Sequence, residues 1–76
     1  MDSRLDELIK KGTELLKNGK YEESLSYFDQ ALILKPNDPD LLNKKGVVLR
    51  SLGRYDEAIE CYNKSLSIEA RDLDAS

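Results

Sequence analysis

Histidine is absent from this 76-residue sequence, and cysteine occurs once, at Cys61. One cysteine cannot form an internal disulfide, and without histidine none of the usual zinc ligand sets can be assembled. We therefore expect no disulfide, no bound metal and no cofactor. Cys61 falls among helix-packing positions and has no histidine to activate it, so we interpret it as a packing residue and not a nucleophile.

Long apolar runs and an excess of positive charge are missing too. The longest apolar runs, such as residues 31–34, span one helical turn, whereas a membrane crossing needs about 20 residues. The net charge is −3, and acidic and basic residues are mixed along the chain, which does not favour binding to nucleic acid. The N-terminal residues lack the basic region and apolar stretch of a secretory signal. We expect a cytoplasmic protein that binds neither membrane nor nucleic acid.

The chain contains an internal repeat with a period of 34 residues. Residues 5–38 laid on residues 39–72 are identical at eleven positions: Asp6/Asp40, Leu8/Leu42, Lys10/Lys44, Lys11/Lys45, Gly12/Gly46, Leu15/Leu49, Gly19/Gly53, Tyr21/Tyr55, Glu23/Glu57, Leu32/Leu66 and Asp38/Asp72. We therefore predict one domain made of repeat 1 (5–38) and repeat 2 (39–72). Residues 73–76 are interpreted as a tail or as the start of a truncated third repeat.

Each copy predicts two helices. Gly19 and Gly53 each follow an apolar stripe of helical spacing and can supply the left-handed residue that ends a helix. Pro36 stops the second helix, while Asp38 can cap the third, with Pro39 at its first position. The expected helices lie near 3–18, 21–35, 39–52 and 55–69.

Two glycines, Gly12 and Gly46, fall in the middle of predicted helices, where glycine costs about 1 kcal/mol relative to alanine. The simplest explanation is a contact with the partner helix that leaves no room for a side chain, and Ser24 and Ala58 are small for the same contact. Each helix pair is then an antiparallel hairpin. We predict an all-α fold of two stacked helix-turn-helix hairpins, four antiparallel helices of an α-solenoid.

This pattern resembles the tetratricopeptide repeat over residues 5–72. The resemblance rests on small, aromatic and proline residues in register: Gly12, Gly19, Tyr21, Phe28, Ala31 and Pro36, and then Gly46, Gly53, Tyr55, Ala58 and Tyr62. Leu8 and Leu42 stand where the family often has tryptophan, and Ala70 stands where it has proline. The final helix is therefore expected to run on.

The resemblance implies a protein-interaction module that binds a peptide or helix of a partner protein in a concave groove. The first helix of each repeat lines that groove, which places there Asp6, Ile9, Lys10, Thr13, Leu16, Lys17, Asp40, Asn43, Lys44, Val47, Arg50 and Ser51. Ile9, Leu16 and Val47 would be oddly placed on this face unless they contacted a partner. The alternative is a solvated helix face whose lysines pair with Asp6, Glu14 or Asp40.

One subclass of the family grips the C-terminal carboxylate of cytosolic chaperones with lysine, asparagine and arginine at set positions. At these positions this sequence has Ile9, Thr13 and Lys44, and it has no third repeat. Carboxylate capture of that kind is not expected.

A second class of function is self-association. The last helix of such a stack has an open side, and we predict an apolar edge there formed by Ile59, Tyr62 and Leu66. This edge would drive homo-oligomerisation, or the chain would be a fragment of a longer array.

An enzyme is not predicted. The paired acids Glu22-Glu23 and Asp56-Glu57 occupy the first turn of each second helix, where negative charge interacts favourably with the helix dipole. No nucleophile has a base at a recognisable spacing, and no catalytic residue is predicted.

Overall fold

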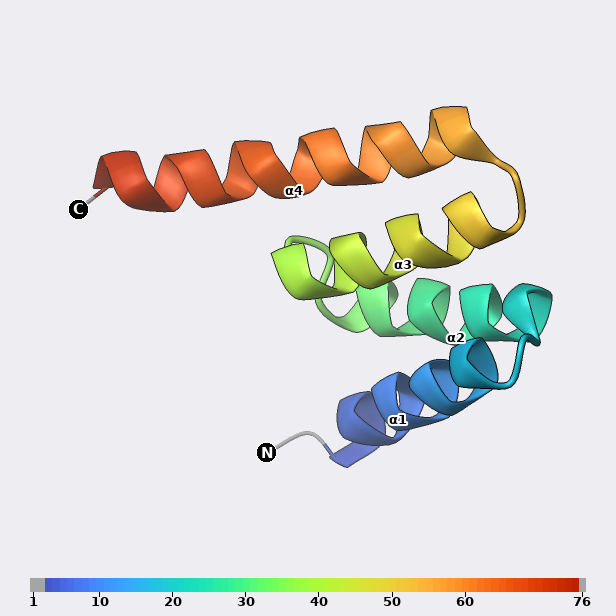
Figure 1. Ribbon diagram of the computed structural model, residues 1–76. Coiled ribbons are helices and arrows are strands. Elements are labelled where there is room, and N and C mark those ends of the chain that lie inside the picture. The colour runs from blue at the N-terminus through green and yellow to red at the C-terminus, as the bar shows by residue number, and fades with distance from the viewer. Residues whose placement is uncertain (1–2, 76) are drawn as a thin grey trace.

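The computed structural model describes residues 3–75, and their side chains as far as residue 71. It has four helices, α1 (Ser3–Lys17), α2 (Tyr21–Leu34), α3 (Pro39–Ser51) and α4 (Tyr55–Ala75). They follow one another through the stack, and each runs antiparallel to the next (Figure 1). The predicted all-α fold is confirmed, and the bounds of the first three helices agree within one residue. The fourth continues past Ala70 to Ala75 instead of ending near residue 69.

Glycine ends α1 and α3 in the same way. Gly19 and Gly53 have φ angles of +78° and +81°, a left-handed conformation that residues with a Cβ rarely adopt. The following amides reach back into the helix, from Lys20 N to Leu15 O at 2.8 Å and from Arg54 N to Leu49 O at 2.9 Å. These bonds satisfy carbonyls that would otherwise lack a partner. The predicted role of both glycines is confirmed.

The turn between the repeats stops one helix and starts the next. Lys35 has left the helical conformation (φ −136°, ψ 80°), as expected for a residue that precedes proline. Asp38 then caps α3, since its Oδ1 accepts hydrogen bonds from Asp40 N at 2.9 Å and Leu41 N at 3.3 Å. Pro39 occupies the first turn, where its missing N–H leaves no bond unmade. The predicted cap is therefore confirmed.

Each hairpin is held by a close contact at its mid-helix glycine. A Cβ on Gly12 would lie 3.0 Å from Cε1 of Phe28, and a Cβ on Gly46 would lie 2.6 Å from Cε1 of Tyr62. Both rings belong to the second helix of the same repeat, so the predicted helix contact is confirmed. The free energy gained by this packing offsets the poor helix propensity of glycine.

Two serines strengthen the hairpins in a way that the repeat pattern did not predict. Ser24 and Ser65 are fully buried. Ser24 Oγ donates to the Gly12 carbonyl at 2.7 Å, and Ser65 Oγ donates to the Pro39 carbonyl at 3.2 Å. Since a buried hydroxyl without a partner is costly, these bonds allow serine at positions where alanine would otherwise suffice.

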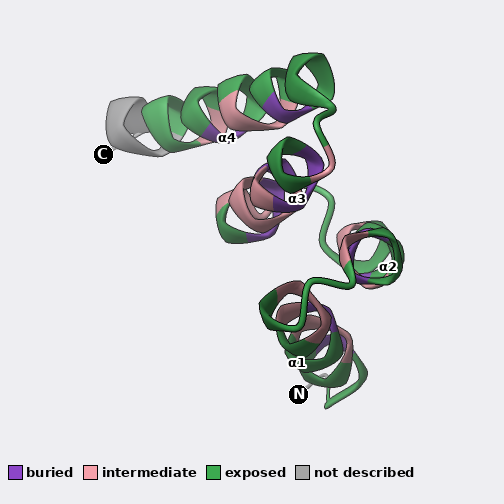
Figure 2. Ribbon diagram, turned by 45° about the vertical axis from the view of Figure 1, so that its right-hand side comes forward, coloured by how far each residue is buried: buried purple, intermediate pink, exposed green. Residues whose placement is uncertain are grey.

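The core is a thin seam between neighbouring helices, in which α2 packs against both α1 and α3, and α4 packs against α3. Figure 2 shows the buried residues on the sides of the helices that face one another. The core cluster consists of Leu5, Leu25, Phe28, Ala31, Leu41, Val48, Leu49 and Ala58. Leu41 is 1% exposed, although the equivalent position of the first repeat is Glu7.

Candidate functional site

The twelve residues predicted to line the groove lie on α1 and α3, which run in the same direction (Figure 1). We call them the α1–α3 surface. Both helices pack against α2, which lies to the right of α1 and α3 in Figure 2. The exposed members are Asp6, Lys10, Lys17, Asp40, Arg50 and Ser51, and the half-buried members are Ile9, Thr13, Leu16, Asn43, Lys44 and Val47.

The apolar members of this surface differ in what they contact. Ile9 and Leu16 pack against the core cluster, so each has a structural role besides any contact with a partner. Val47 is half-buried and does not belong to the residues packed on that cluster. Val47 is therefore the apolar side chain best placed to contact another molecule without already serving the core.

Two hydroxyl groups of the α1–α3 surface donate hydrogen bonds to carbonyls of their own helix. Thr13 Oγ1 donates to the Ile9 carbonyl at 2.8 Å, and Ser51 Oγ donates to the Val47 carbonyl at 3.0 Å. Such bonds to the preceding turn are common for these residues in helices. Thr13 and Ser51 consequently offer a partner an acceptor oxygen and not a free donor.

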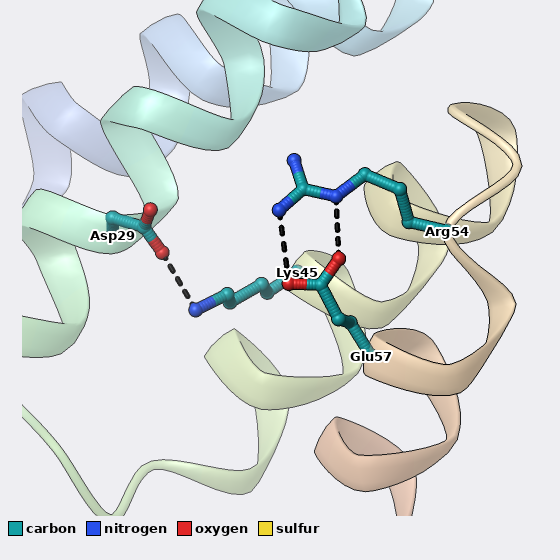
Figure 3. Close-up of polar contacts among 4 residues, drawn as sticks. All are labelled: Asp29, Lys45, Arg54 and Glu57. Carbon is teal, nitrogen blue, oxygen red and sulfur yellow. Dashed lines mark hydrogen bonds and ion pairs between the residues drawn. The ribbon is translucent and has the colours of Figure 1, made fainter.

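The lysines of the α1–α3 surface do not form the pairs with Asp6, Glu14 or Asp40 that the solvated-face alternative suggested. Among the residues with described side chains, ion pairs join Lys45 to Asp29 at 2.8 Å and Arg54 to Glu57 (Figure 3). Neither pair includes a member of this surface. Its cations, Lys10, Lys17, Lys44 and Arg50, thus form no ion pair with a carboxylate in that part of the chain.

Charge is distributed unevenly along this surface. Asp6 and Asp40 lie in the first turns of α1 and α3, whereas Lys17 and Arg50 lie in the last turns. Because the two helices run in the same direction, acids gather at one end of the surface and bases at the other. This arrangement also complements the helix dipoles, but it gives the surface an electrostatic direction that a bound segment would meet.

The pair at the start of α4 is a surface feature. Arg54 Nη2 donates to Glu57 Oε1 at 2.9 Å, and this hydrogen bond raises the pKa of Arg54 and lowers the pKa of Glu57. A lowered carboxyl pKa contributes stability at neutral pH that is lost as pH falls through the folded-state value. Both side chains are exposed to solvent, so the contribution is modest.

Cys61 is half-buried in α4, and this burial raises the pKa of its thiol. Because the thiolate is the reactive form, we expect Cys61 to react several-fold more slowly with an aromatic disulfide reagent near pH 8 than it does in the urea-unfolded chain. The measurement is the rate of absorbance change in the two conditions. A native rate equal to or above the unfolded rate would contradict the packing role of Cys61.

The predicted edge on α4 is exposed at two of its three positions. Ile59 is 55% and Leu66 is 63% exposed. Tyr62 differs from the expectation, since its ring lies over Gly46 and packs against the core cluster. Tyr55, one of the aromatic residues of the repeat pattern, is 62% exposed. We define the open face of α4 as Tyr55, Ile59, Leu66 and the exposed Asn63 between them.

Another exposed apolar residue, Ile33, lies near the end of α2 and was not predicted from the sequence. Ile33 is 79% exposed and borders two shallow hollows. The equivalent residue of the second repeat is Ser67, so the repeat pattern does not predict an apolar residue at this position. The hollows are also lined by Leu32, Pro36, Leu42, Lys45 and Lys64 on one side and by Arg4, Leu8, Gln30 and Leu34 on the other.

The family model of the tetratricopeptide repeat matches residues 9–75, and no curated protein matches the sequence. Within the described part of the chain, no helix has the length and apolar character needed to span a membrane. Over the same residues, no three acidic or cysteine side chains converge as a metal site would require.

Proposed function

Because the chain belongs to the tetratricopeptide repeat family, we propose that it binds a segment of a partner protein, a peptide or a helix, on the α1–α3 surface. The family generally consists of protein-interaction scaffolds without enzymatic activity. The observation that carries the proposal is the set of four cations on this surface that form no ion pair with a described carboxylate. A bound protein segment would supply such carboxylates.

The arrangement of charge suggests how such a segment would lie. Acidic residues of the partner would be favoured over Lys17 and Arg50, at the C-terminal turns of α1 and α3, and disfavoured over Asp6 and Asp40. An apolar side chain of the partner would meet Val47 between these two ends. Charge complementarity of this kind contributes chiefly to orientation and to the rate of association.

The test is a variant of the α1–α3 surface that leaves the core untouched. Ile9 packs on the core, so we choose Val47→Glu combined with Arg50→Glu on α3. The variant is expected to keep the helical circular dichroism of the wild type and to bind the partner, first recovered from the source organism by wild-type protein, at least about tenfold more weakly. Titration calorimetry with the purified partner gives the affinity.

Ile33→Glu is the matched control, because Ile33 is an exposed apolar residue outside the α1–α3 surface. It is expected to bind the partner with wild-type affinity. Wild-type affinity in the double variant, or an equal loss in the control, would contradict the proposal.

A cytoplasmic location stays a prediction from the sequence.

A second candidate function is self-association through the open face of α4. The supporting observation is the exposure of Ile59 and Leu66 on a helix whose main packing partner is α3. Covering about 200 Å² of apolar surface would be worth roughly 5 kcal/mol before entropy is subtracted. That is comparable to the whole stability of a small domain.

A further inference from the structure

The exposure of residues on the open face of α4 can be compared with that of the equivalent residues on α2, because the two helices occupy the same place in the two repeats. Leu25 on α2 is 8% exposed, whereas Ile59 at the same repeat position on α4 is 55% exposed. The difference recurs at the other two apolar positions of the face, Tyr21 against Tyr55 and Leu32 against Leu66. Since α3 packs on α2, these residues show what burial a covering helix provides.

The face of α3 that covers α2 is apolar except for one lysine. Leu41, Lys45, Val48 and Leu52 recur at the spacing of one helix face, and Lys45 reaches Asp29 of α2 at 2.8 Å. Leu41 and Val48 are 1% and 0% exposed. A helix that covers α4 in the same manner therefore needs apolar residues at these positions.

The equivalent face of α1 does not meet this requirement. The residues that lie 34 positions before those of α3 are Glu7, Lys11, Glu14 and Asn18, and all four are exposed. If α1 of a second copy were placed on α4, Glu7 and Glu14 would occupy the sites of buried Leu41 and Val48. Burying these carboxylates without partners is strongly unfavourable. Head-to-tail stacking of copies is therefore disfavoured.

The open face of α4 also differs from α2 at the position of the ion pair. Asn63 stands where α2 has Asp29, so a covering helix of the α3 type would bury its lysine without the carboxylate that Lys45 has. The same change makes the open face of α4 neutral, since none of its four residues carries a charge. Within the seam between two such faces no like charges would meet, while the exposed acids Asp56 and Glu69 flank it.

We propose that the open face of α4 packs against the same face of a second copy, with the two helices antiparallel, in a closed two-fold dimer. The proposal rests on the second candidate function given above. The exposed residues 55, 59, 63 and 66 are spaced by four, four and three positions, so they lie along one side of α4 and can form a seam with the same side of a second helix. Ile59 then lies opposite Leu66 of the partner subunit, and the two Asn63 amides lie near the axis and hydrogen-bond each other.

In a two-fold contact of this kind, association ends at two copies. The same patch serves both subunits, so one contact buries both open faces. The outer face of α1, with Glu7, Lys11, Glu14 and Asn18, stays in solvent at both ends of the dimer. The polar face of α1 and the neutral face of α4 thus have complementary roles in limiting the assembly.

Equilibrium sedimentation tests the proposal on the full chain, from about 1 μM to 1 mM. The wild type is expected to change from monomer to dimer, and Ile59→Lys combined with Leu66→Lys is expected to stay monomeric. Asn63→Asp, which restores the residue type of α2, is expected to weaken the dimer at least about tenfold near pH 7 through repulsion at the axis. The controls Asn63→Gln and Ile33→Lys are expected to dimerise like the wild type.

A further variant separates the dimer from head-to-tail stacking. Glu7→Leu with Glu14→Leu gives α1 the apolar face of α3, and this protein is expected to form species larger than a dimer that grow with concentration. If the wild type already grows beyond a dimer, the two-fold arrangement is overturned while self-association stands. A wild type that remains monomeric at the highest concentration overturns both, and neither result bears on binding to the α1–α3 surface.

Discussion

Replacing Gly46 with leucine is expected to lower the free energy of unfolding by about 3 kcal/mol or more. A Cβ at this position would lie 2.6 Å from Cε1 and 2.8 Å from Cζ of Tyr62, so α3 and α4 would have to separate or the ring would have to leave the contact. Leucine has the better helix propensity, by roughly 0.8 kcal/mol. This gain is smaller than the cost of overpacking, and the net effect is destabilising.

The same substitution at Gly12 is expected to cost at least as much, although the closest contact there is longer. The Cβ would lie 3.0 Å from Phe28, and Phe28 is fully buried, whereas Tyr62 is only half-buried. Urea unfolding followed by circular dichroism gives both values, with Lys64→Ala as an exposed control. A shift of the unfolding midpoint no larger than that of the control would show that the helices are not closely packed at these glycines.

The second large effect is a difference between two positions that are equivalent in the repeats. Leu25→Ala is expected to destabilise the chain by about 2–4 kcal/mol, because Leu25 is a core residue with only 8% of its surface exposed. Ile59→Ala is expected to cost less than about 1 kcal/mol when measured at a concentration where the protein is monomeric. The presence of α3 over α2 is the physical cause of the difference.

The destabilisation caused by these two substitutions is also expected to depend differently on protein concentration. If the open face of α4 is buried in a dimer, the cost of Ile59→Ala rises with concentration, since association stabilises the folded state by mass action. The cost of Leu25→Ala is expected to stay nearly constant over the same range. Equal losses at the two positions in the monomer would show that burial under α3 does not account for the difference in exposure.

Features that depend on a few neighbouring residues were predictable from the sequence. Gly19 and Gly53 end helices because only glycine readily adopts the left-handed conformation, and Asp38 caps α3 through amides two and three residues away. The run of α4 past Ala70 also follows from the local sequence, since no proline is there to stop it. The contacts at Gly12 and Gly46 were inferred because glycine is unfavourable in a helix unless packing offsets the cost.

The side of each helix that becomes buried was predicted less well. Tyr55 and Tyr62 belong to one apolar stripe on α4, but Tyr62 packs over Gly46 while Tyr55 stays exposed. Leu41 is buried, although the same position in the first repeat is Glu7. Both outcomes depend on which helix lies next to the residue, and repeat periodicity does not contain that information.

The sequence by itself determined the number of repeats, the ends of the first three helices and the all-α fold, because turn chemistry and helical periodicity act within about one or two turns of the chain. Only the tertiary structure decided that Ile9 and Leu16 pack against the core, and that the lysines of the α1–α3 surface form no ion pairs with the acids near them. It also decided that the apolar residues Ile59 and Leu66 on the open face of α4 are exposed. Burial and charge pairing are set by neighbouring helices. Equivalent positions such as Leu25 and Ile59 therefore have different environments although both are apolar residues of the same repeat position.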